Sequence, residues 1–343
     1  MLERIVHIPE LVSEMLDQLS AELWTSSTTT FLDPAMGSGQ FVSAIERRLA
    51  AHGHSADNIA ARVSGYEDNR LLIDLAKNLH GLVGQYSKVS YNESLQDGDN
   101  MKFDVIIGNP PYQKENNSAK RWTLWELFVE KSLGMGSIVA MVVPQSLTSP
   151  GKTFEMIRSK CTVLNIDVSK HFNVGSTFCY FVADERGNGG KTRIVTDDAE
   201  YTQDIRQLPF IPVVINPTTM AQINDLMARP KRLWKRGELH TSNTAKFSVD
   251  GQYTVMHTNA QTLRSDVDHP NRNKIRVGVT LSGYPTFKVV LDGYMSQACF
   301  WTEFDTVAEA QMFADDCNGD TVQGLLEVFK WSGWNSKEVI KCL

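Results

Sequence analysis

The sequence has little cysteine and no cysteine pattern. Its 343 residues include five cysteines, an odd number, and no two of them form a Cys-x-x-Cys pair. This argues against a disulfide framework and against a structural zinc site, and it is typical of a reducing compartment. Histidine and carboxylate side chains also lack the spacing of a metal site, so we expect no bound metal.

Long apolar runs are missing as well. The longest, Ile138 to Val143, is far shorter than the ~20 residues that cross a bilayer. The first residues include Glu3 and Arg4 and contain no apolar signal core. We therefore expect a cytoplasmic protein with no membrane contact. Hydrophobic residues make up 42% of the chain, enough for a sizeable core, and the length predicts about two domains.

An excess of positive charge, common in nucleic-acid-binding proteins, is absent from the whole chain, whose net charge is −6. The average conceals one basic block, because residues 229–288 contain 11 Lys/Arg against four Asp/Glu. A local block of this kind is what phosphate contact requires, so the overall acidity does not exclude a nucleic-acid partner.

Strand and helix patterns alternate through the first part of the chain. Expected strands are a short one ending at Leu32, then 62–66, 87–91, 103–107, 137–143, 163–168 and 177–183. Expected helices are 9–24, 40–51, 71–82, 124–133 and 153–160. This alternation predicts an α/β fold with a seven-stranded, mainly parallel sheet that has helices on both faces. The last two strands, joined without a clear helix, predict an antiparallel hairpin at the sheet edge.

Beyond a glycine-rich loop near residues 187–190 the alternation is lost. Short strand-like runs at 210–215, 253–257 and 288–291 precede a helical pattern over 307–329. We therefore expect a first domain over 1–186 and a C-terminal α+β domain over 187–343.

A glycine loop follows the first expected strand and opens a helix. It reads Asp33-Pro34-Ala35-Met36-Gly37-Ser38-Gly39-Gln40-Phe41. Glycine lets the backbone turn sharply and approach a ligand closely, and this context is typical of nucleotide-binding loops. A turn that needs glycine for geometry alone remains an alternative.

Acidic residues follow the next two strands. Glu67 and Asp68 come directly after the second strand, where a carboxylate accepts hydrogen bonds from ribose hydroxyls in nucleotide-binding folds. Glu93, after the third strand, is a candidate contact for an adenine ring. A solvated acidic loop is the alternative for each.

The fourth strand ends in Asn109-Pro110-Pro111-Tyr112. Two successive prolines fix two φ angles and remove two backbone donors, so carbonyl oxygens in this turn remain available as acceptors. A simple turn does not explain an amide directly before the prolines and an aromatic residue directly after them.

Together, the glycine loop and the Asn-Pro-Pro-Tyr turn resemble motifs of the S-adenosylmethionine-dependent DNA adenine-N6 methyltransferases. The order of motifs resembles the gamma class, and the resemblance covers roughly residues 5–185. It implies a Rossmann-like methyltransferase domain followed by a target-recognition domain. His7 to Val12 is similar to the family's Thr-Pro cofactor segment, with Ile8 in place of the threonine. The residues that the resemblance implies in S-adenosyl-L-methionine binding are Pro9, Asp33, Pro34, Ala35, Gly37, Gly39, Phe41, Glu67, Asp68, Glu93 and Asn109.

The resemblance also implies a catalytic group. Asn109 and the Pro110 carbonyl accept the hydrogens of the adenine amino group, Pro111 stiffens the turn, and Tyr112 stacks on a flipped-out base. Phe172, in His171-Phe172-Asn173-Val174, is a second stacking candidate. Residues 113–121 are expected to close over the extruded nucleotide.

The implied partners are double-stranded DNA and a cognate restriction endonuclease. We expect the enzyme to be a monomer and to act in a bacterial or phage-type cell. The basic block supplies the DNA-binding candidates Lys231, Arg232, Lys235, Arg236, Arg264, Arg272, Lys274 and Arg276. Three alternatives stay open: methylation of RNA adenine, methylation of a protein glutamine amide, and a catalytically silent binding subunit. For the first basic cluster a solvated surface is also an alternative.

Overall fold

The computed structural model describes residues 9–90, 102–112, 124–172, 177–196, 199–212, 215–241, 247–258, 261–268, 270–328 and 337–343. The chain forms two compact units, Met1–Pro209 and Phe210–Leu343. This division lies 23 residues after the boundary expected at residue 186. Two strands that follow the glycine-rich loop belong to the first unit, as described below.

One large sheet organises the first unit. Its strand order is β3-β2-β1-β4-β5-β7-β6-β8-β9, and most neighbouring strands run parallel. The strands are β1 (Phe31–Asp33), β2 (Val63–Glu67), β3 (Gln85–Lys88), β4 (Phe103–Gly108), β5 (Gly136–Pro144), β6 (Cys161–Asn165), β7 (Phe178–Asp184), β8 (Thr192–Val195) and β9 (Glu200–Gln203). The seven expected strands are all present, and β8 and β9 extend the sheet to nine.

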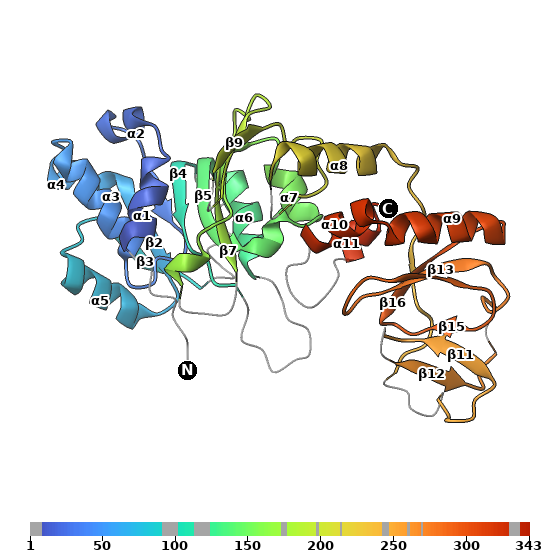
Figure 1. Cartoon of the computed structure of the whole chain (residues 1–343). Helices are drawn as coiled ribbons and strands as arrows, with labels where there is room; N and C mark the ends of the chain where they lie inside the picture. The colour runs from blue at the N-terminus through green and yellow to red at the C-terminus, as the bar shows by residue number, and fades with distance from the viewer. Residues whose placement is uncertain are drawn as a thin grey trace. The chain divides into compact units, whose positions relative to one another are not determined.

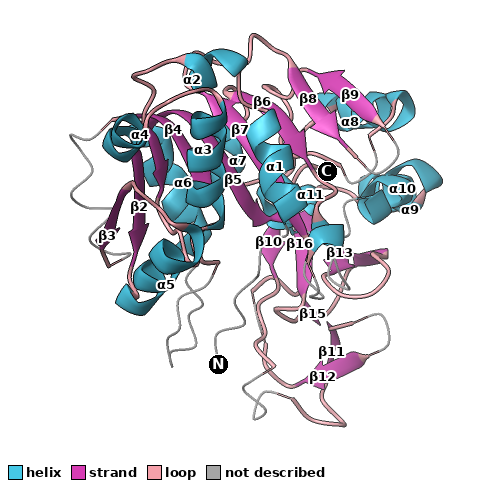
Figure 2. Ribbon diagram, turned by 90° about the vertical axis from the view of Figure 1, so that its left-hand side faces the viewer, coloured by secondary structure: helices cyan, strands magenta, loops and turns pink. Residues whose placement is uncertain are grey.

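The expected α/β fold is confirmed, with helices on both faces of the sheet. The helices of this unit are α1 (Pro9–Asp17), α2 (Ala21–Thr25), α3 (Gln40–Ala51), α4 (Ala56–Arg62), α5 (Arg70–His80), α6 (Leu124–Met135) and α7 (Lys152–Ile157), with short 3-10 turns η2 (Gln145–Thr148) and η3 (Ser169–His171). In Figure 1, α1, α3 and α5 cover one face while α6 and α7 cover the other. Figure 2 shows the same helices flanking the strands from a second direction.

The central strands are apolar because both of their faces are covered. β4, β5 and β7 are buried over almost their whole length, which explains their continuous apolar sequences. β6 and β7 pair antiparallel, as expected. They do not form the sheet edge, however, because β7 pairs with β5 and β6 pairs with β8.

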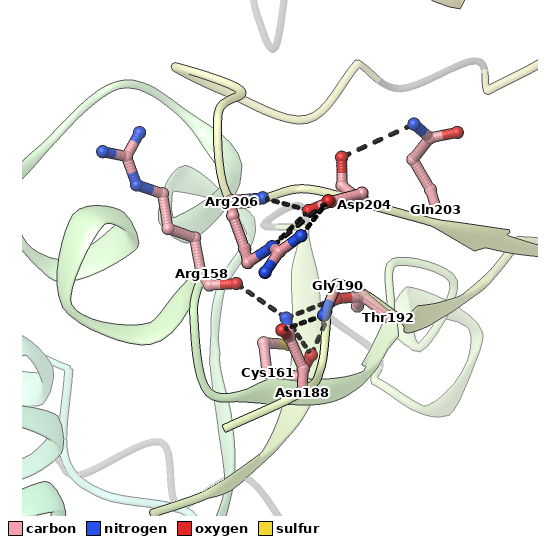
Figure 3. Close-up of polar contacts among 8 residues, drawn as sticks. All are labelled: Arg158, Cys161, Asn188, Gly190, Thr192, Gln203, Asp204 and Arg206. Atoms are coloured by element: carbon pink, nitrogen blue, oxygen red, sulfur yellow. Dashed lines mark hydrogen bonds and ion pairs between the residues drawn. The ribbon is translucent and has the colours of Figure 1, made fainter. Parts of the chain in front are cut away.

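A polar cluster fixes the loop that joins β7 to β8 (Figure 3). The buried Asn188 side chain donates to the backbone oxygens of Arg158 and Cys161, at 2.9 and 3.2 Å, and its Oδ1 accepts from the Gly190 amide. Thr192, at the start of β8, also donates to the Cys161 oxygen at 2.7 Å. These bonds attach β8 to β6, so a segment whose glycines suggested a domain boundary continues the sheet.

The second unit is built from two small sheets and a helical layer. A four-stranded antiparallel sheet has the order β10-β16-β13-β14, and a three-stranded sheet has the order β12-β11-β15. The elements are α8 (Pro217–Ala228), β10 (Lys235–Arg236), β11 (Tyr253–Met256), β12 (Thr262–Ser265), β13 (Arg276–Thr280), β14 (Phe287–Val290), β15 (Tyr294–Met295), β16 (Cys299–Glu303), α9 (Val307–Asn318), α10 (Asp320–Val328) and α11 (Lys337–Ile340).

Two of the three strand-like runs expected in this unit, near 253–257 and 288–291, are strands. The run at 210–215 is not a strand in its described residues. The helical pattern over 307–329 is two helices, because Gly319 ends α9 before α10 begins. Within the described ranges, no helix is long and apolar enough to span a membrane. The same ranges contain no group of three or more His, Cys, Asp or Glu side chains arranged to hold a metal ion.

Candidate active site

The glycine loop and the Asn-Pro-Pro-Tyr turn lie at the carboxyl ends of two adjacent parallel strands. β1 pairs with β4 on one side and with β2 on the other, so the strand order reverses between β1 and β4. In open α/β sheets this switch point is where ligands bind, outside the carboxyl ends of the strands. Asp33 ends β1, Glu67 ends β2, and Asn109 directly follows β4.

Asp33 is a buried acid at this switch point, with 1% of its surface exposed. Its Oδ1 accepts a hydrogen bond from the Ala35 amide at 3.0 Å. Burial raises the pKa of Asp33 to about 7, and the nearby Glu67 carboxylate adds to the increase. A Cβ on Gly108 would lie 2.5 Å from the same Oδ1, so β4 approaches this carboxyl as closely as glycine allows.

Glu67 connects the second strand to the glycine loop. One carboxylate oxygen accepts from the Gly37 amide at 3.0 Å and the other from the Asn69 amide at 3.1 Å. The side chain is buried, and burial raises the pKa of Glu67. The acid and the loop, 30 residues apart in sequence, therefore meet at one point. The neighbouring Asp68 is exposed.

The two glycines of the loop have different roles. Both have positive φ, +52° at Gly37 and +81° at Gly39. A Cβ on Gly37 would have no atom within 4 Å, so the space on this side of the residue is open. A Cβ on Gly39 would lie 2.9 Å from the Cβ of Ala76. Gly39 thus allows α3 to pack against α5, while Gly37 leaves its backbone accessible to a ligand.

The remaining cofactor candidates differ in exposure. Pro34 is buried, Ala35 is half-buried, and Pro9 is exposed at the start of α1. Phe41 is 2% exposed and belongs to the hydrophobic core, so its side chain supports the loop from within the fold.

The side chains of Asn109 and Tyr112 are joined by a hydrogen bond. The Tyr112 hydroxyl donates to the Asn109 Oδ1 at 2.5 Å, and burial raises the pKa of Tyr112, which keeps the hydroxyl protonated. The Tyr112 ring stacks on Phe178, with ring centres 5.1 Å apart. Phe178 also contacts Phe172, with ring centres 4.6 Å apart. The two aromatic residues chosen from the sequence are thus joined through a third, Phe178. Pro110 is buried and Pro111 half-buried in the same turn.

Residues 44–174 match the family model described as Eco57I restriction-modification methylase. The match includes the Asn-Pro-Pro-Tyr turn and confirms for this segment the resemblance that the sequence motifs indicated. A search of curated proteins returned no match to the chain.

This chain is similar to several solved structures. The enzyme LlaGI, of Type ISP, in complex with a DNA substrate mimic, has a TM-score of 0.54 at 9% identity, over 88% of this chain and 42% of that one. DrdV in complex with DNA has a TM-score of 0.51 at 11% identity, over 87% and 49%. A putative type I modification subunit from Vibrio vulnificus YJ016 has a TM-score of 0.45 at 15% identity, over 57% and 48%. The chain spans about half the length of these structures.

Four candidate DNA contacts lie close together at one edge of the second unit. Lys231, Arg232, Lys235 and Arg236 are all exposed, and the last two form the edge strand β10. Arg232 lies 3.9 Å above the Phe304 ring and Lys235 lies 5.0 Å from the Trp301 ring centre. None of the four forms an ion pair with a described residue, although the charge of Lys235 lowers the pKa of Glu303 and Arg236 donates to the Gln297 oxygen at 2.8 Å.

The other candidate cations are largely occupied by contacts within the protein. Lys274 pairs with Glu303 at 2.8 Å, and Arg272 pairs with Asp268 at 3.1 Å. Arg264 is exposed, and its Nε donates to a backbone oxygen at 2.6 Å. The structure does not support a DNA contact for Arg276. Its side chain is fully buried and pairs with Glu238 at 3.0 Å, so it holds the interior of the unit together.

Sequence reasoning missed Phe178 and also Glu14, whose carboxylate accepts from the Asn165 amide and the Tyr180 hydroxyl. Phe178 starts β7, and its pairing with Pro144 brings it to the carboxyl end of β5. That pairing depends on β7 running antiparallel, which the expected hairpin suggested. Glu14 gave no signal, because a single acid on an amphipathic helix is ordinary. Glu93, Asn173 and the expected closing loop at 113–121 lie outside the described residues.

Proposed function

We propose that this chain is a site-specific DNA methyltransferase that transfers a methyl group from S-adenosyl-L-methionine to the N6 amine of adenine. The observation that carries the proposal is the placement of Asn109. Asn109 directly follows the buried strand β4, which pairs with β1 at the switch point. Its side-chain oxygen accepts from Tyr112, whose ring stacks on Phe178. The match of residues 44–174 to a restriction-modification methylase family supports this reading.

The residues at the ends of β1 and β2 fit S-adenosyl-L-methionine. The open space beside Gly37 allows a ligand to approach the backbone, and Glu67 presents a carboxylate at the position that binds ribose hydroxyls in related folds. In this proposal a ribose hydroxyl would donate to the Glu67 oxygen that now accepts from the Gly37 amide, and the bond to the amide would weaken. When bound, S-adenosyl-L-methionine supplies an electrophilic methyl group on a sulfonium centre.

Asn109 and Pro110 would activate the amine by position and dipoles. The adenine amine is a poor nucleophile because its lone pair is delocalised into the ring. A carbonyl oxygen has two lone pairs, so the Asn109 Oδ1 can accept from both Tyr112 and one amino hydrogen. The Pro110 carbonyl accepts the other hydrogen. The nitrogen would then become more tetrahedral, with its lone pair directed at the methyl donor that S-adenosyl-L-methionine supplies. S-adenosylhomocysteine would be the leaving product, and one amino proton would pass to solvent.

Access to the amine requires a flipped base, because the target atom lies inside the duplex stack. Tyr112 provides a ring face for the extruded base, and Phe178 and Phe172 support that ring from behind. In the second unit, the cluster Lys231, Arg232, Lys235 and Arg236 would contact phosphates of double-stranded DNA, and base-reading side chains would set the site. A restriction endonuclease acting on the same site is a proposed second partner.

Transfer from labelled S-adenosyl-L-methionine to three acceptors tests the proposal. Duplex DNA, RNA of the same sequence and a denatured protein mixture are incubated separately with the protein. We expect label in DNA only. Label in RNA or protein with none in DNA would show that DNA is not the substrate. Cofactor binding with no transfer to any acceptor would support a silent binding subunit.

A further inference from the structure

A carboxylate on α1 lies at the centre of a polar network behind the aromatic rings. The Oε1 of Glu14 accepts from the Asn165 side-chain amide at 2.7 Å and from the Tyr180 hydroxyl at 2.9 Å. Its Oε2 lies 3.8 Å from the Nε2 of His171. Asn165 ends β6, Tyr180 lies on β7, and His171 ends the turn η3. One side chain thus joins α1 to three segments from the other end of the first unit's sequence.

The turn η3 directly precedes the aromatic residues of the candidate site. The Phe172 amide donates to the Ser169 oxygen at 3.0 Å, and the Phe178 amide donates to the Ser169 hydroxyl oxygen at 3.0 Å. Among the described residues, the Nε2 of His171 has no hydrogen-bond partner although it is buried. The Glu14 carboxylate, 3.8 Å away, lies within ion-pair distance of this nitrogen.

Contacts continue from this turn to the proposed catalytic group. Phe172 packs on Phe178, Phe178 stacks on Tyr112, and Tyr112 donates to Asn109. A shift of η3 would move Phe172 and Phe178 and would remove the support of the Tyr112 ring. Packed interiors transmit such shifts because they contain few voids.

We propose that Glu14 is a positioning residue for methyl transfer, which holds η3 and β7 so that Phe172 and Phe178 support Tyr112 in the orientation that receives the base. This inference rests on the proposed function. Burial and the Glu14 carboxylate raise the pKa of Tyr180, so its hydroxyl stays protonated and continues to donate to Glu14. In this proposal the effect of Glu14 is indirect, through its contacts with Asn165, Tyr180 and His171.

The test compares two variants of Glu14 with a control on the same helix. Glu14→Ala removes the acceptor, whereas Glu14→Gln keeps an oxygen for Asn165 and Tyr180. Asp17→Asn is the matched control, because it removes an ion pair between α1 and Arg48 without touching η3 or β7. Hydrogen–deuterium exchange of residues 166–172 is measured without DNA, together with cofactor affinity and the kcat and KM for DNA methylation.

We expect Glu14→Ala to accelerate exchange at the amides of His171 and Phe172 and to lower kcat about tenfold, the effect of losing bonds to one charged group. Cofactor affinity should not change, and Glu14→Gln should recover most of the lost rate. Asp17→Asn should behave as wild type. If Glu14→Ala fails to fold, Tyr180→Phe removes one donor and should lower kcat about threefold, again without a change in cofactor affinity.

Unchanged exchange of 166–172 in Glu14→Ala, or an unchanged kcat, overturns the positioning role. Equal losses in Glu14→Ala and Glu14→Gln would also overturn it, because the retained oxygen would then have no effect. A wild type that binds cofactor but never methylates adenine contradicts the proposed function, while the exchange data still decide whether Glu14 holds η3.

Discussion

At the scale of single residues, the bond between Tyr112 and Asn109 gives the tyrosine two separable contributions. Its ring offers a stacking face, and its hydroxyl fixes the orientation of the Asn109 oxygen. The sequence predicted the ring face and gave no indication of the hydroxyl bond, because that bond depends on how the two prolines turn the chain.

Variants of Tyr112 separate these contributions. We expect Tyr112→Ala to lose base capture, since stacking is worth ~1–3 kcal/mol per base. Tyr112→Phe should keep capture and lose less activity, by the ~1 kcal/mol of one hydrogen bond. With 2-aminopurine at the mapped target position, the fluorescence rise on flipping should persist in Tyr112→Phe and vanish in Tyr112→Ala. If both variants lose the signal equally, stacking is not the role of this ring.

Asp33 makes stability depend on pH. Its pKa is about 7 in the folded protein, against 3.8 when unperturbed. Between these values the folded state retains a proton that the unfolded state has released, so rising pH lowers the free energy of unfolding. The full loss, reached above pH 7, is at most about 4 kcal/mol.

Asp33→Asn should therefore flatten the pH dependence of unfolding between pH 4 and 7. It should also be more stable than the wild type at pH 8. Urea unfolding at several pH values measures both effects, and Asp57→Asn, on the exposed face of α4, is the control. Parallel curves for wild type and Asp33→Asn would contradict the buried, protonated carboxyl.

Arg276 illustrates a limit of sequence reasoning at this scale. It lies in a basic block, and composition alone made it a DNA contact. The structure buries it against Glu238, a residue 38 positions away in the sequence. Charge counts cannot distinguish a cation that faces solvent from one paired inside a fold. The positions of Asn109 and Gly37, at the ends of buried strands, were predictable because they depend on local sequence.

At the scale of elements, the loop between β1 and α3 unites two requirements. Gly37 must leave the space at its Cβ position open, and Gly39 must let α3 approach α5. Substitution of Gly39 would therefore disturb packing along with any ligand contact, which makes Glu67 the better probe of cofactor binding.

We expect Glu67→Ala to weaken S-adenosyl-L-methionine binding at least tenfold, since it removes the acceptor that holds the loop and the proposed ribose contact. Glu67→Gln keeps one acceptor oxygen and should lose less. Calorimetric titration of the cofactor measures the dissociation constants, and thermal unfolding checks that each variant folds. An unchanged constant in a folded Glu67→Ala protein would place the ribose contact on another residue.

Most elements of the first unit were predictable because apolar strands alternate with amphipathic helices. The helix expected over 9–24 is two helices, with Ser20 capping the second. The strands β8 and β9 were missed because a glycine-rich loop resembles a linker. Only tertiary contacts, such as those of Asn188 with the Arg158 and Cys161 backbone, reveal that the loop is an ordered connection within the sheet.

At the scale of the whole molecule, an acidic chain can bind DNA if its positive charge is concentrated. We expect the quadruple Ala variant of Lys231, Arg232, Lys235 and Arg236 to weaken DNA binding on many sequences. The slope of log affinity against log salt should flatten by ~0.9 for each lost phosphate contact. Cofactor affinity should stay unchanged.

A salt titration of DNA binding compares this variant with the wild type. The control is Lys88→Ala with Lys191→Ala, two exposed lysines of the first unit. Equal affinity and parallel slopes for wild type and the quadruple variant would mean that the cluster does not touch DNA. The search would then move to Arg264, the other exposed candidate without an ion pair to a described residue.

The central claim is that Asn109 directs a methyl group to the N6 amine of adenine in DNA. Mass spectrometry of nucleosides, after incubation of duplex DNA with S-adenosyl-L-methionine, tests it most directly. The wild type should produce N6-methyladenine. Asn109→Ala should retain most of its cofactor binding and produce ~10²–10³-fold less, the typical loss when one preorganised acceptor is removed. Methylated cytosine in place of methylated adenine, or wild-type yield from Asn109→Ala, would contradict the claim.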